Sequence, residues 1–222
     1  MTLTATLIGD VVASRRAGDR SALHERLTAH LDEVNSTCAP TTPLRITVGD
    51  EFQGTFATVG QALHASLRLR VGLLPAHDVR HGIGWGEVTV FQDQPRVEDG
   101  PGWWAARDAI HDVQEAQQHP GSRFRRTAYR RAESDGAPAD ASQNASGGGP
   151  DPALVNAVLV LRDATVGGLS ERSVSVLRGL LAGQTQREIA ELLGISPSAV
   201  SQRVRADSLA ALVHADRELG RV

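Results

Sequence analysis

The first 131 residues alternate between strand-like and helix-like patterns of hydrophobic and polar positions. Residues 2–9 alternate polar and apolar side chains and end at Ile8-Gly9-Asp10, which predicts a strand that stops at a turn. Apolar residues at helical spacing predict helices over residues 19–34, 59–74 and 103–118. Two short apolar runs on either side of Gly49-Asp50 predict a hairpin, and residues 79–90 and 124–131 predict two further strands.

The order of these elements determines the expected fold class. Strand, helix, hairpin, helix, strand and helix follow one another, and the long connections fall where a ferredoxin-like or palm-type sheet needs its crossovers. We therefore expect an α+β palm domain over residues 1–131, with an antiparallel sheet and helices packed on it. The alternating glycines of His81-Gly82-Ile83-Gly84-Trp85-Gly86 predict that another backbone approaches this strand closely.

The composition changes after residue 131. Residues 132–151 consist mainly of Ala, Ser, Asp, Gly and Pro and offer almost nothing to bury, which predicts a flexible linker and a domain boundary. Residues 152–222 are expected to form a second, small all-α domain. It begins with an apolar helix over residues 153–165 that Gly167-Gly168 ends.

Residues 169–206 contain three helix starts in close succession. Ser170 is suited to cap the first helix, and Thr185 forms a capping box with Glu188 at the start of the second. Ser196 caps the third helix, with a proline following at its first turn. Only a short turn containing Gly194 separates the last two helices, and this pattern predicts a helix-turn-helix.

A helix-turn-helix needs a small core and an exposed face on its last helix. The predicted core consists of Ile189, Ala190, Leu193, Ile195, Val200 and Val204. The candidate DNA-binding residues carry hydroxyl, amide or guanidinium groups suited to a major groove: Ser196, Ser198, Ser201, Gln202, Arg203 and Arg205. The alternative is a helical hairpin that docks on the first domain or on a partner without touching DNA.

Composition and charge limit the partners and the location of the protein. A chain of 222 residues that is 41% hydrophobic can bury one large core or two modest ones. Its net charge of −3 excludes a chain-wide basic character, so contact with double-stranded DNA must be local. The single cysteine excludes a disulfide framework, and no segment has the pattern of a signal peptide or a membrane span. We therefore expect a cytoplasmic protein without membrane contact.

Two carboxylates of the first domain are expected to lie close together. Asp10 closes the first strand and Asp50 lies at the tip of the hairpin, and these elements are neighbours in a palm sheet. Two like charges at one edge favour a bridging cation, and carboxylate oxygens suit Mg²⁺. The alternative is that Asp10 is a turn or cap residue and Asp50 an ordinary hairpin residue.

Several motifs resemble those of the SatD family. They are Ile8-Gly9-Asp10-Val11-Val12-Ala13-Ser14-Arg15, Thr47-Val48-Gly49-Asp50-Glu51-Phe52-Gln53, Gly82-Ile83-Gly84-Trp85-Gly86, and Asp99-Gly100-Pro101 followed by Ala106-Arg107-Asp108-Ala109. The resemblance spans nearly the whole chain but implies little biochemistry. Residues 184–196 also resemble the helix-turn-helix of sigma-factor region four and of LuxR-type regulators. That resemblance implies recruitment to promoter DNA by a domain that works as a dimer or beside RNA polymerase.

The first domain also resembles class III nucleotide cyclases and GGDEF-type palm domains. Position by position, this resemblance implies two metal ligands, two backbone amides facing phosphates and one arginine that contacts the ligand; these are Asp10 and Asp50, Val11 and Val12, and Arg107. The cyclase asparagine four residues before that arginine is Trp103 here, and the chain has no Lys for purine recognition. We therefore expect a retained nucleotide-binding pocket without cyclase turnover.

Three functions are compatible with these patterns. They are a ligand-responsive DNA-binding regulator, a metal-dependent nucleotidyl cyclase or related phosphotransfer enzyme, and a non-catalytic adaptor of the transcription machinery. The first uses all the motifs. It predicts a homodimer, because two arginines on one helix give a monomer little affinity for DNA. It also predicts a nucleotide or another phosphorylated ligand, Mg²⁺ in the palm domain and contact with RNA polymerase.

Overall fold

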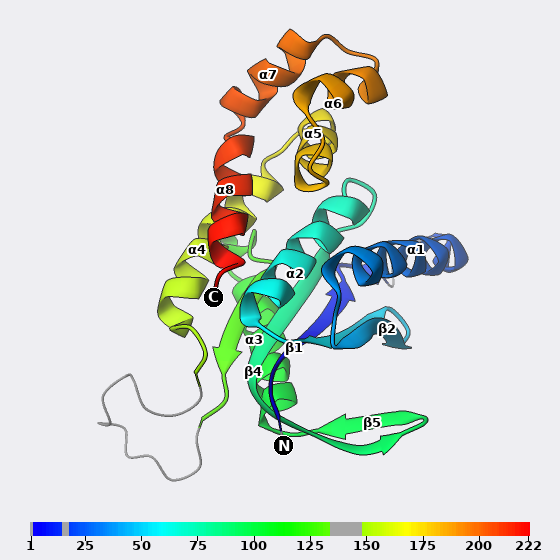
Figure 1. Cartoon of the computed structure of the whole chain (residues 1–222), viewed down its shortest axis with the longest axis vertical. Helices are drawn as coiled ribbons and strands as arrows, with labels where there is room; N and C mark the ends of the chain where they lie inside the picture. Colours follow the sequence, from blue (N-terminus) through cyan, green and yellow to red (C-terminus); the bar gives the residue numbers. More distant parts are fainter. Residues whose placement is uncertain (1, 15–17, 134–147) are drawn as a thin grey trace.

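The computed structural model describes residues 2–14, 18–133 and 148–222, and its first half is built on a six-stranded sheet (Figure 1). The strands are β1 (Thr2–Val11), β2 (Thr42–Val48), β3 (Glu51–Phe56), β4 (Val79–Asp93), β5 (Arg96–Asp99) and β6 (Thr127–Arg131). They lie in the order β2-β3-β1-β4-β5, with β6 beside β4. The antiparallel order β2-β3-β1-β4 is the ferredoxin-like arrangement that the sequence predicts, so the expected α+β fold class is confirmed.

Helices cover both faces of this sheet. They are α1 (Arg20–Cys38), α2 (Val59–Leu73) and α3 (Pro101–Ala116), and a single 3-10 turn, η2 (Pro120–Ser122), follows α3. Successive residues of β1 point to opposite faces: Leu7 packs into the core that contains α1 and α2, whereas Ile8 packs with Trp103 and Ile110 of α3. The Thr6 hydroxyl also donates to the carbonyl of Gly102 at 2.7 Å. Ile8 and Thr6 of β1 therefore help to hold α3 against this face of the sheet.

The sheet differs from the prediction in two respects. Strand β5 was not expected, and it pairs with the end of β4 as a projecting arm (Figure 1). Strand β6 lies parallel to β4, so the expectation of an antiparallel sheet is wrong at this edge. The reason is topological: β5 and α3 together carry the chain back along β4, so the next strand, β6, runs in the same direction as β4.

The alternating glycines of β4 allow α3 to lie directly on the sheet. A Cβ atom on Gly82 would collide with the backbone of Ala106, and one on Gly84 would collide with the carbonyl of Gly102. The predicted close approach of another backbone to this strand is confirmed. It fixes where the first turns of α3 lie, and these turns form a wall of the pocket described below.

The second half of the chain is helical. Its helices are α4 (Pro152–Gly167), α5 (Glu171–Leu181), α6 (Gln186–Leu193), α7 (Pro197–Ala206) and α8 (Leu209–Leu219). Helix α4 packs on the palm: Val155 and Leu159 lie in the same core as Leu7, and Asn156 forms two hydrogen bonds with the backbone of Tyr129 on β6. Of the predicted linker over residues 132–151, residues 134–147 lie outside the described part of the chain, as does Arg15 of the first motif.

The core of the last helices continues into the palm. Leu67 and Val71 of α2 pack in one cluster with Val166 of α4, Leu177 of α5 and Leu212 of α8. Helix α2 contributes side chains to two cores, one on each of its sides. A displacement of α2 would therefore change the packing both against the sheet and against the terminal helices.

A buried network of charges also joins α4 to the palm. Asp163, 1% exposed, accepts hydrogen bonds from the backbone N–H groups of Arg126 and Thr127, both at 2.7 Å, and from the guanidinium of Arg70 at 3.0 Å. Arg70, itself 2% exposed, also binds Asp78 at 2.8 Å. Burial alone would raise the pKa of Asp78, but Arg70 and Arg126 outweigh that effect and hold this pKa below its usual value. The Asp78 carboxylate therefore stays charged.

Candidate functional site

The turn between α6 and α7 is built by local interactions. The Thr185 hydroxyl accepts from the amide of Glu188 at 3.2 Å, and the Glu188 carboxylate accepts from the amide of Thr185 at 2.7 Å. Gly194 ends α6 with a φ of +64°, a conformation that favours glycine. Ser196 then caps α7, with Pro197 at its first position. The predicted capping box, turn and N-caps are all confirmed.

Helix α7 lies at the far end of the molecule from the sheet (Figure 1). One side of this helix packs inward, and the other side is exposed. Val200 and Val204 face inward and are buried, together with Ile189 and Ala190, and Leu193 and Ile195 pack against the same cluster, so the predicted core is confirmed. On a helix of 3.6 residues per turn, the opposite side carries Ser198, Ser201, Gln202 and Arg205. Ser201 is half-buried and the other three are exposed, as is the capping residue Ser196.

Arg203 does not belong to this exposed face. Its guanidinium lies 3.4 Å from the hydroxyl of Ser170 and 3.3 Å from that of Ser173, both at the start of α5. Arg203 is half-buried, because residue 203 follows the inward-facing Val200 by three positions and falls on the side that packs against α5. Its placement indicates a contact within the domain.

Helices α2 and α5 cap each other at their C-terminal ends. Arg178 of α5 donates to the carbonyls of Val71, Gly72 and Leu74 at 3.0, 3.3 and 2.8 Å. In return, Arg68 of α2 donates to the carbonyl of Leu181 at 2.9 Å. The last carbonyls of a helix lack intrahelical partners and carry partial negative charge, so both contacts are favourable. They fix the orientation of the helix-turn-helix on the palm.

Protonated His64 should stabilise the docking of α8 on α2. Its Nδ1 lies 2.6 Å from Oδ2 of Asp216, and the hydrogen bonds to Asp216 and Cys38 raise the pKa of His64 to about 9. An unfolded histidine titrates near 6.5, so this stabilisation is complete below about pH 6.5 and is lost as the pH rises through about 9. We expect the free energy of unfolding to fall over this interval more steeply than in His64→Gln. Urea titrations at a series of pH values would measure it, and parallel profiles for the two proteins would contradict the prediction.

Asp10 and Asp50 lie at the same end of the sheet, but the carboxylate of each is hydrogen-bonded to another group of the chain. Both oxygens of Asp10 contact Arg80, its cross-strand neighbour on β4, at 2.6 and 3.1 Å, and Gln114 of α3 donates to Asp10 at 3.2 Å. The carboxylate of Asp50 accepts from the amide of Val11 at 3.0 Å. A cation shared by Asp10 and Asp50 does not fit this arrangement, because Arg80 already neutralises Asp10.

The two backbone amides expected to face phosphates are also used within the chain. The amide of Val11 donates to Asp50, and that of Val12 donates to the carbonyl of Asp78 at 2.8 Å. The expectation that both amides point to a ligand is therefore wrong for this arrangement. Because Asp78 also contacts Arg70, and Arg70 contacts Asp163, the end of β1 is connected to α4 through three successive contacts.

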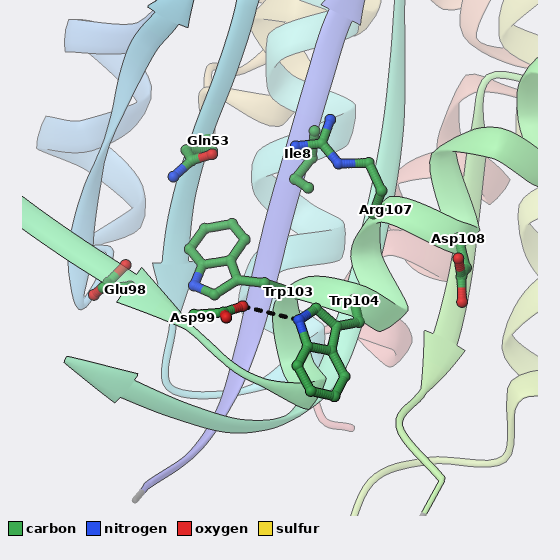
Figure 2. Close-up of a pocket in the computed structure, with 8 residues that line it drawn as sticks. All are labelled: Ile8, Gln53, Glu98, Asp99, Trp103, Trp104, Arg107 and Asp108. Carbon is green, nitrogen blue, oxygen red and sulfur yellow. Dashed lines mark hydrogen bonds between the residues drawn. The ribbon is translucent and has the colours of Figure 1, made fainter. Parts of the chain in front are cut away.

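A pocket of about 340 Å³ lies between the start of α3, strand β5 and the neighbouring strands β1 and β3 (Figure 2). Its volume is within the range of small-molecule sites. Helix α3 packs on β1, β4 and β6, and the pocket lies beside the first turns of this helix. The lining residues are Ile8, Gln53, Glu98, Asp99, Trp103, Trp104, Arg107 and Asp108.

Two buried polar atoms in the wall of this pocket have no hydrogen-bond partner among the described residues. They are Nε1 of Trp103, a residue 8% exposed, and Oε2 of Glu98, whose side chain is 2% exposed. The other oxygen of Glu98 is held by Arg96 at 2.7 Å and by Thr42 at 3.3 Å. In Figure 2 the indole nitrogen of Trp103 points to the side on which Glu98 lies. A buried donor and a buried acceptor that both lack partners carry a free-energy penalty that a ligand can remove.

The two tryptophans of α3 play different parts. Trp103 is buried, whereas Trp104 is 59% exposed and donates to Asp99 at 2.8 Å (Figure 2). Arg107, the predicted ligand-binding arginine, lines the same pocket and binds Glu51 at 3.0 Å. The structure thus places Arg107 on the α3 face of the sheet that also carries Asp10, but each is paired with a different residue.

Several residues of this region were not identified from the sequence. Glu98 and Asp99 belong to the unexpected strand β5, and Arg80 and Glu51 pair with predicted ligand residues. The one available signal is two acidic residues directly before the helix that carries both tryptophans.

Across the described ranges, no group of three or more His, Cys, Asp or Glu residues is arranged to hold a metal ion. None of the described helices has the length and apolar character that crossing a membrane requires.

Two family models match different parts of the chain. The model of the SatD family matches residues 4–130, more than half of the chain. The model described as bacterial regulatory proteins, luxR family, matches residues 168–205, which include the helix-turn-helix. No curated protein is significantly similar to the chain in sequence.

Three solved structures illustrate the similarity in three dimensions. The catalytic core of a rhodopsin-guanylyl cyclase with converted specificity has a TM-score of 0.42 and 15% identity, covering 49% of this chain and 71% of that chain. The guanylate cyclase domain from Catenaria anguillulae has a TM-score of 0.40 and 13% identity, covering 49% and 72%. A regulator of polyketide synthase expression from Bifidobacterium adolescentis has a TM-score of 0.26 and 13% identity, covering 100% and 86%. These identities are too low to transfer a ligand or an activity.

Proposed function

This chain belongs to the SatD family, and we propose that it is a sequence-specific DNA-binding regulator whose palm domain senses a small ligand. The observation that carries the DNA-binding part is the luxR-type helix-turn-helix, whose last helix exposes hydroxyl, amide and guanidinium groups on one side. These groups match the donors and acceptors that base pairs present in the major groove.

Local charge supports DNA as the partner of this surface. Residues 169–206 contain five arginines and three glutamates, a net charge of +2 in a chain whose overall net charge is −3. Arg187, in the first turn of α6, is 84% exposed and lies near the N-terminal end of its helix, where phosphate groups bind favourably. The charge of one helix-turn-helix is small, so the proposal includes a homodimer with two recognition helices. It also includes contact with RNA polymerase at the promoter.

The experiment that tests DNA binding uses the full chain and a library of random double-stranded DNA. We expect repeated selection to enrich one sequence motif, and gel shifts with that motif to weaken linearly on a logarithmic salt scale. Failure to enrich any motif would overturn the proposal, and co-purification with RNA polymerase in that case would favour the adaptor.

For the palm domain, we propose a nucleotide or another phosphorylated ligand that carries a planar nitrogen heterocycle. Trp103 offers an N–H donor and Glu98 a carboxylate acceptor within the wall of one pocket, and a heterocycle edge with adjacent donor and acceptor atoms would satisfy both. The indole rings supply flat apolar surface, and Arg107, once it releases Glu51, supplies a cation for an anionic group. We propose binding without turnover, and formation of a cyclic nucleotide would overturn that part.

Replacing Glu98 with Gln should weaken this ligand about 10- to 100-fold, because a hydrogen bond to a charged group contributes about 1.5–3 kcal/mol. Two of the three tryptophans line the pocket, so quenching of intrinsic fluorescence can follow the titration of a nucleotide panel. Glu191→Gln, on exposed α6, is the matched control and should bind like the wild type. Equal affinity for all three proteins, or no quenching by any nucleotide, would contradict the prediction.

Magnesium needs a separate arm of the same titration. Because Arg80 occupies Asp10, we expect ligand binding to persist without Mg²⁺. If binding instead requires Mg²⁺ and Asp50→Asn weakens metal and ligand together, Arg80 must release Asp10 when the ligand binds, and the metal site expected from the sequence would be restored.

A further inference from the structure

A second pocket, of about 370 Å³, lies in the helical half of the chain, between α8, α7 and the turn that joins α5 to α6. We call it the α8 pocket. Its apolar lining comes from Leu180 of α5, Val204 of α7 and Val213 of α8, and all three residues also pack in the core of the last helices. The α8 pocket is therefore an opening into that core, and its volume is sufficient for a small molecule.

Helix α8 contributes one of its sides to the α8 pocket. The lining residues of α8 are Ala210, Val213, His214 and Arg217. Their spacing of three, one and three positions places them on the same side of a helix. Another side of α8 packs on the palm, where Asp216 binds His64 of α2. A molecule in the α8 pocket would therefore contact the helix that docks the last helices on the palm.

The α8 pocket has a positive charge that is not neutralised within the chain. Of the described residues that line it, only Arg217 carries a permanent charge, and none is Asp or Glu. The two carboxylates next to Arg217 in the sequence are paired elsewhere: Asp216 binds His64 at 2.6 Å, and Glu218 binds Arg221 at 2.8 Å. Among the residues that the structure describes, the Arg217 side chain has no hydrogen-bond or ion-pair partner. Its guanidinium is available to an anion.

Further hydrogen-bond donors line the same pocket. Gln184 lies in the turn before α6, Gln186 is the first residue of α6, and His214 precedes Arg217 by about one turn of α8. Within the described ranges, the side chains of these three residues have no hydrogen-bond partner either. A guanidinium and other N–H donors around an apolar floor match a carboxylate that is attached to a hydrocarbon body.

We infer that the α8 pocket binds a small organic carboxylate with an apolar body. One guanidinium matches the single charge of a carboxylate, whereas a phosphate monoester carries a charge of about −1.5 to −2. The palm pocket has the opposite character, because three carboxylates and one arginine line it: Glu98, Asp99, Asp108 and Arg107. The two pockets therefore select different ligands, and this inference does not depend on the ligand proposed for the palm.

A ligand in the α8 pocket would also contact the helix-turn-helix. Gln186 begins α6, and Val204 lies in α7 directly before the exposed Arg205. Because the pocket is lined by α6, α7 and α8 together, a bound carboxylate would change how α7 is held against α8. The affinity for DNA should then differ between the filled and the empty pocket. This step rests on the proposed function, whereas binding of the carboxylate does not.

Isothermal titration calorimetry of the full chain with octanoate tests the site, with octanamide as the uncharged analogue. The wild type should bind octanoate about 10-fold more tightly, because hydrogen bonds between charged groups are the stronger ones. Arg217→Gln should bind both compounds about equally. Arg221→Gln, the matched control, removes an exposed arginine four positions away and should behave like the wild type. No binding of octanoate, equal binding of both compounds by the wild type, or equal losses in the two variants would overturn the inference.

Two further measurements locate the binding. Ala210→Trp places a large side chain in the α8 pocket, so both compounds should bind at least about 10-fold more weakly, with an unchanged thermal melt because Ala210 is exposed. All three tryptophans of the wild type lie in the palm, so octanoate in the α8 pocket should leave the intrinsic fluorescence unchanged. Quenching of this fluorescence, or wild-type affinity in Ala210→Trp, would place the octanoate elsewhere and overturn the inference.

Gel shifts with the selected DNA motif, with and without saturating octanoate, test the effect on DNA. Octanoate should change the affinity of the wild type for the motif and leave that of Arg217→Gln unchanged. Equal affinities of the wild type in both conditions would contradict the effect on DNA and keep the binding site. A chain that binds octanoate but selects no DNA motif would keep the inference and contradict the proposed function, and a chain that selects a motif but binds no octanoate would do the reverse.

Discussion

Alanine at both Gln202 and Arg205 should abolish sequence-specific DNA binding while the protein stays folded. Both side chains lie on the exposed side of α7, opposite Val200 and Val204, so their removal leaves the small core intact. A bidentate contact to a base contributes about 1–3 kcal/mol. The double variant should therefore bind the selected motif about 30-fold to 25,000-fold more weakly, as measured by gel shifts, while thermal melts of the two proteins should coincide.

Two single variants separate base recognition from other roles. Arg203→Ala should lower stability more than specificity, because its guanidinium contacts Ser170 and Ser173 within the domain. Arg187→Ala should weaken all DNA sequences about equally and reduce the slope of the salt dependence by about one, as expected of a phosphate contact. Should the double variant retain wild-type affinity for the motif, α7 would not be the recognition helix.

Replacing Asp163 with Ala should cause a large loss of stability. Its carboxylate accepts from two backbone amides and from Arg70, all inside the protein. Removing it leaves the buried guanidinium of Arg70 without this partner and both amides unsatisfied. Loss of one member of a buried ion pair costs about 3–5 kcal/mol. For a chain of this size, the melting temperature should fall by roughly 6–20 °C.

Urea and thermal unfolding of three variants would check this expectation. Asp163→Asn should be intermediate, because an amide oxygen can still accept from Arg126 and Thr127 but the charge opposite Arg70 is lost. Glu191→Ala, which breaks the exposed pair with Arg187, should change the unfolding free energy by less than about 0.5 kcal/mol. An Asp163→Ala protein as stable as Glu191→Ala would mean that the network contributes nothing.

The helix-turn-helix was predictable from the sequence almost to the residue. Its capping box, the glycine that ends α6 and the cap of α7 each depend on residues within four positions of one another. Interactions of that range are encoded locally, so pattern and propensity suffice to find them. The order of the first strands and helices was also predictable, because apolar periodicity marks each element and the ferredoxin-like order follows from their succession.

The pairing of charged side chains was decided only by the tertiary structure. Asp10 meets Arg80 seventy positions later, and Arg70 meets Asp163 ninety-three positions later. Nothing in the residues around Asp10 indicates that an arginine on β4 lies opposite it, and that arginine turns an expected cation site into an ion pair. The pocket likewise needs β5 folded back beside α3 before Glu98 and Trp103 share one wall. The sequence by itself thus determines the elements and their caps, whereas the partner that neutralises a charge depends on which strand and helix faces meet, and long-range packing alone sets that.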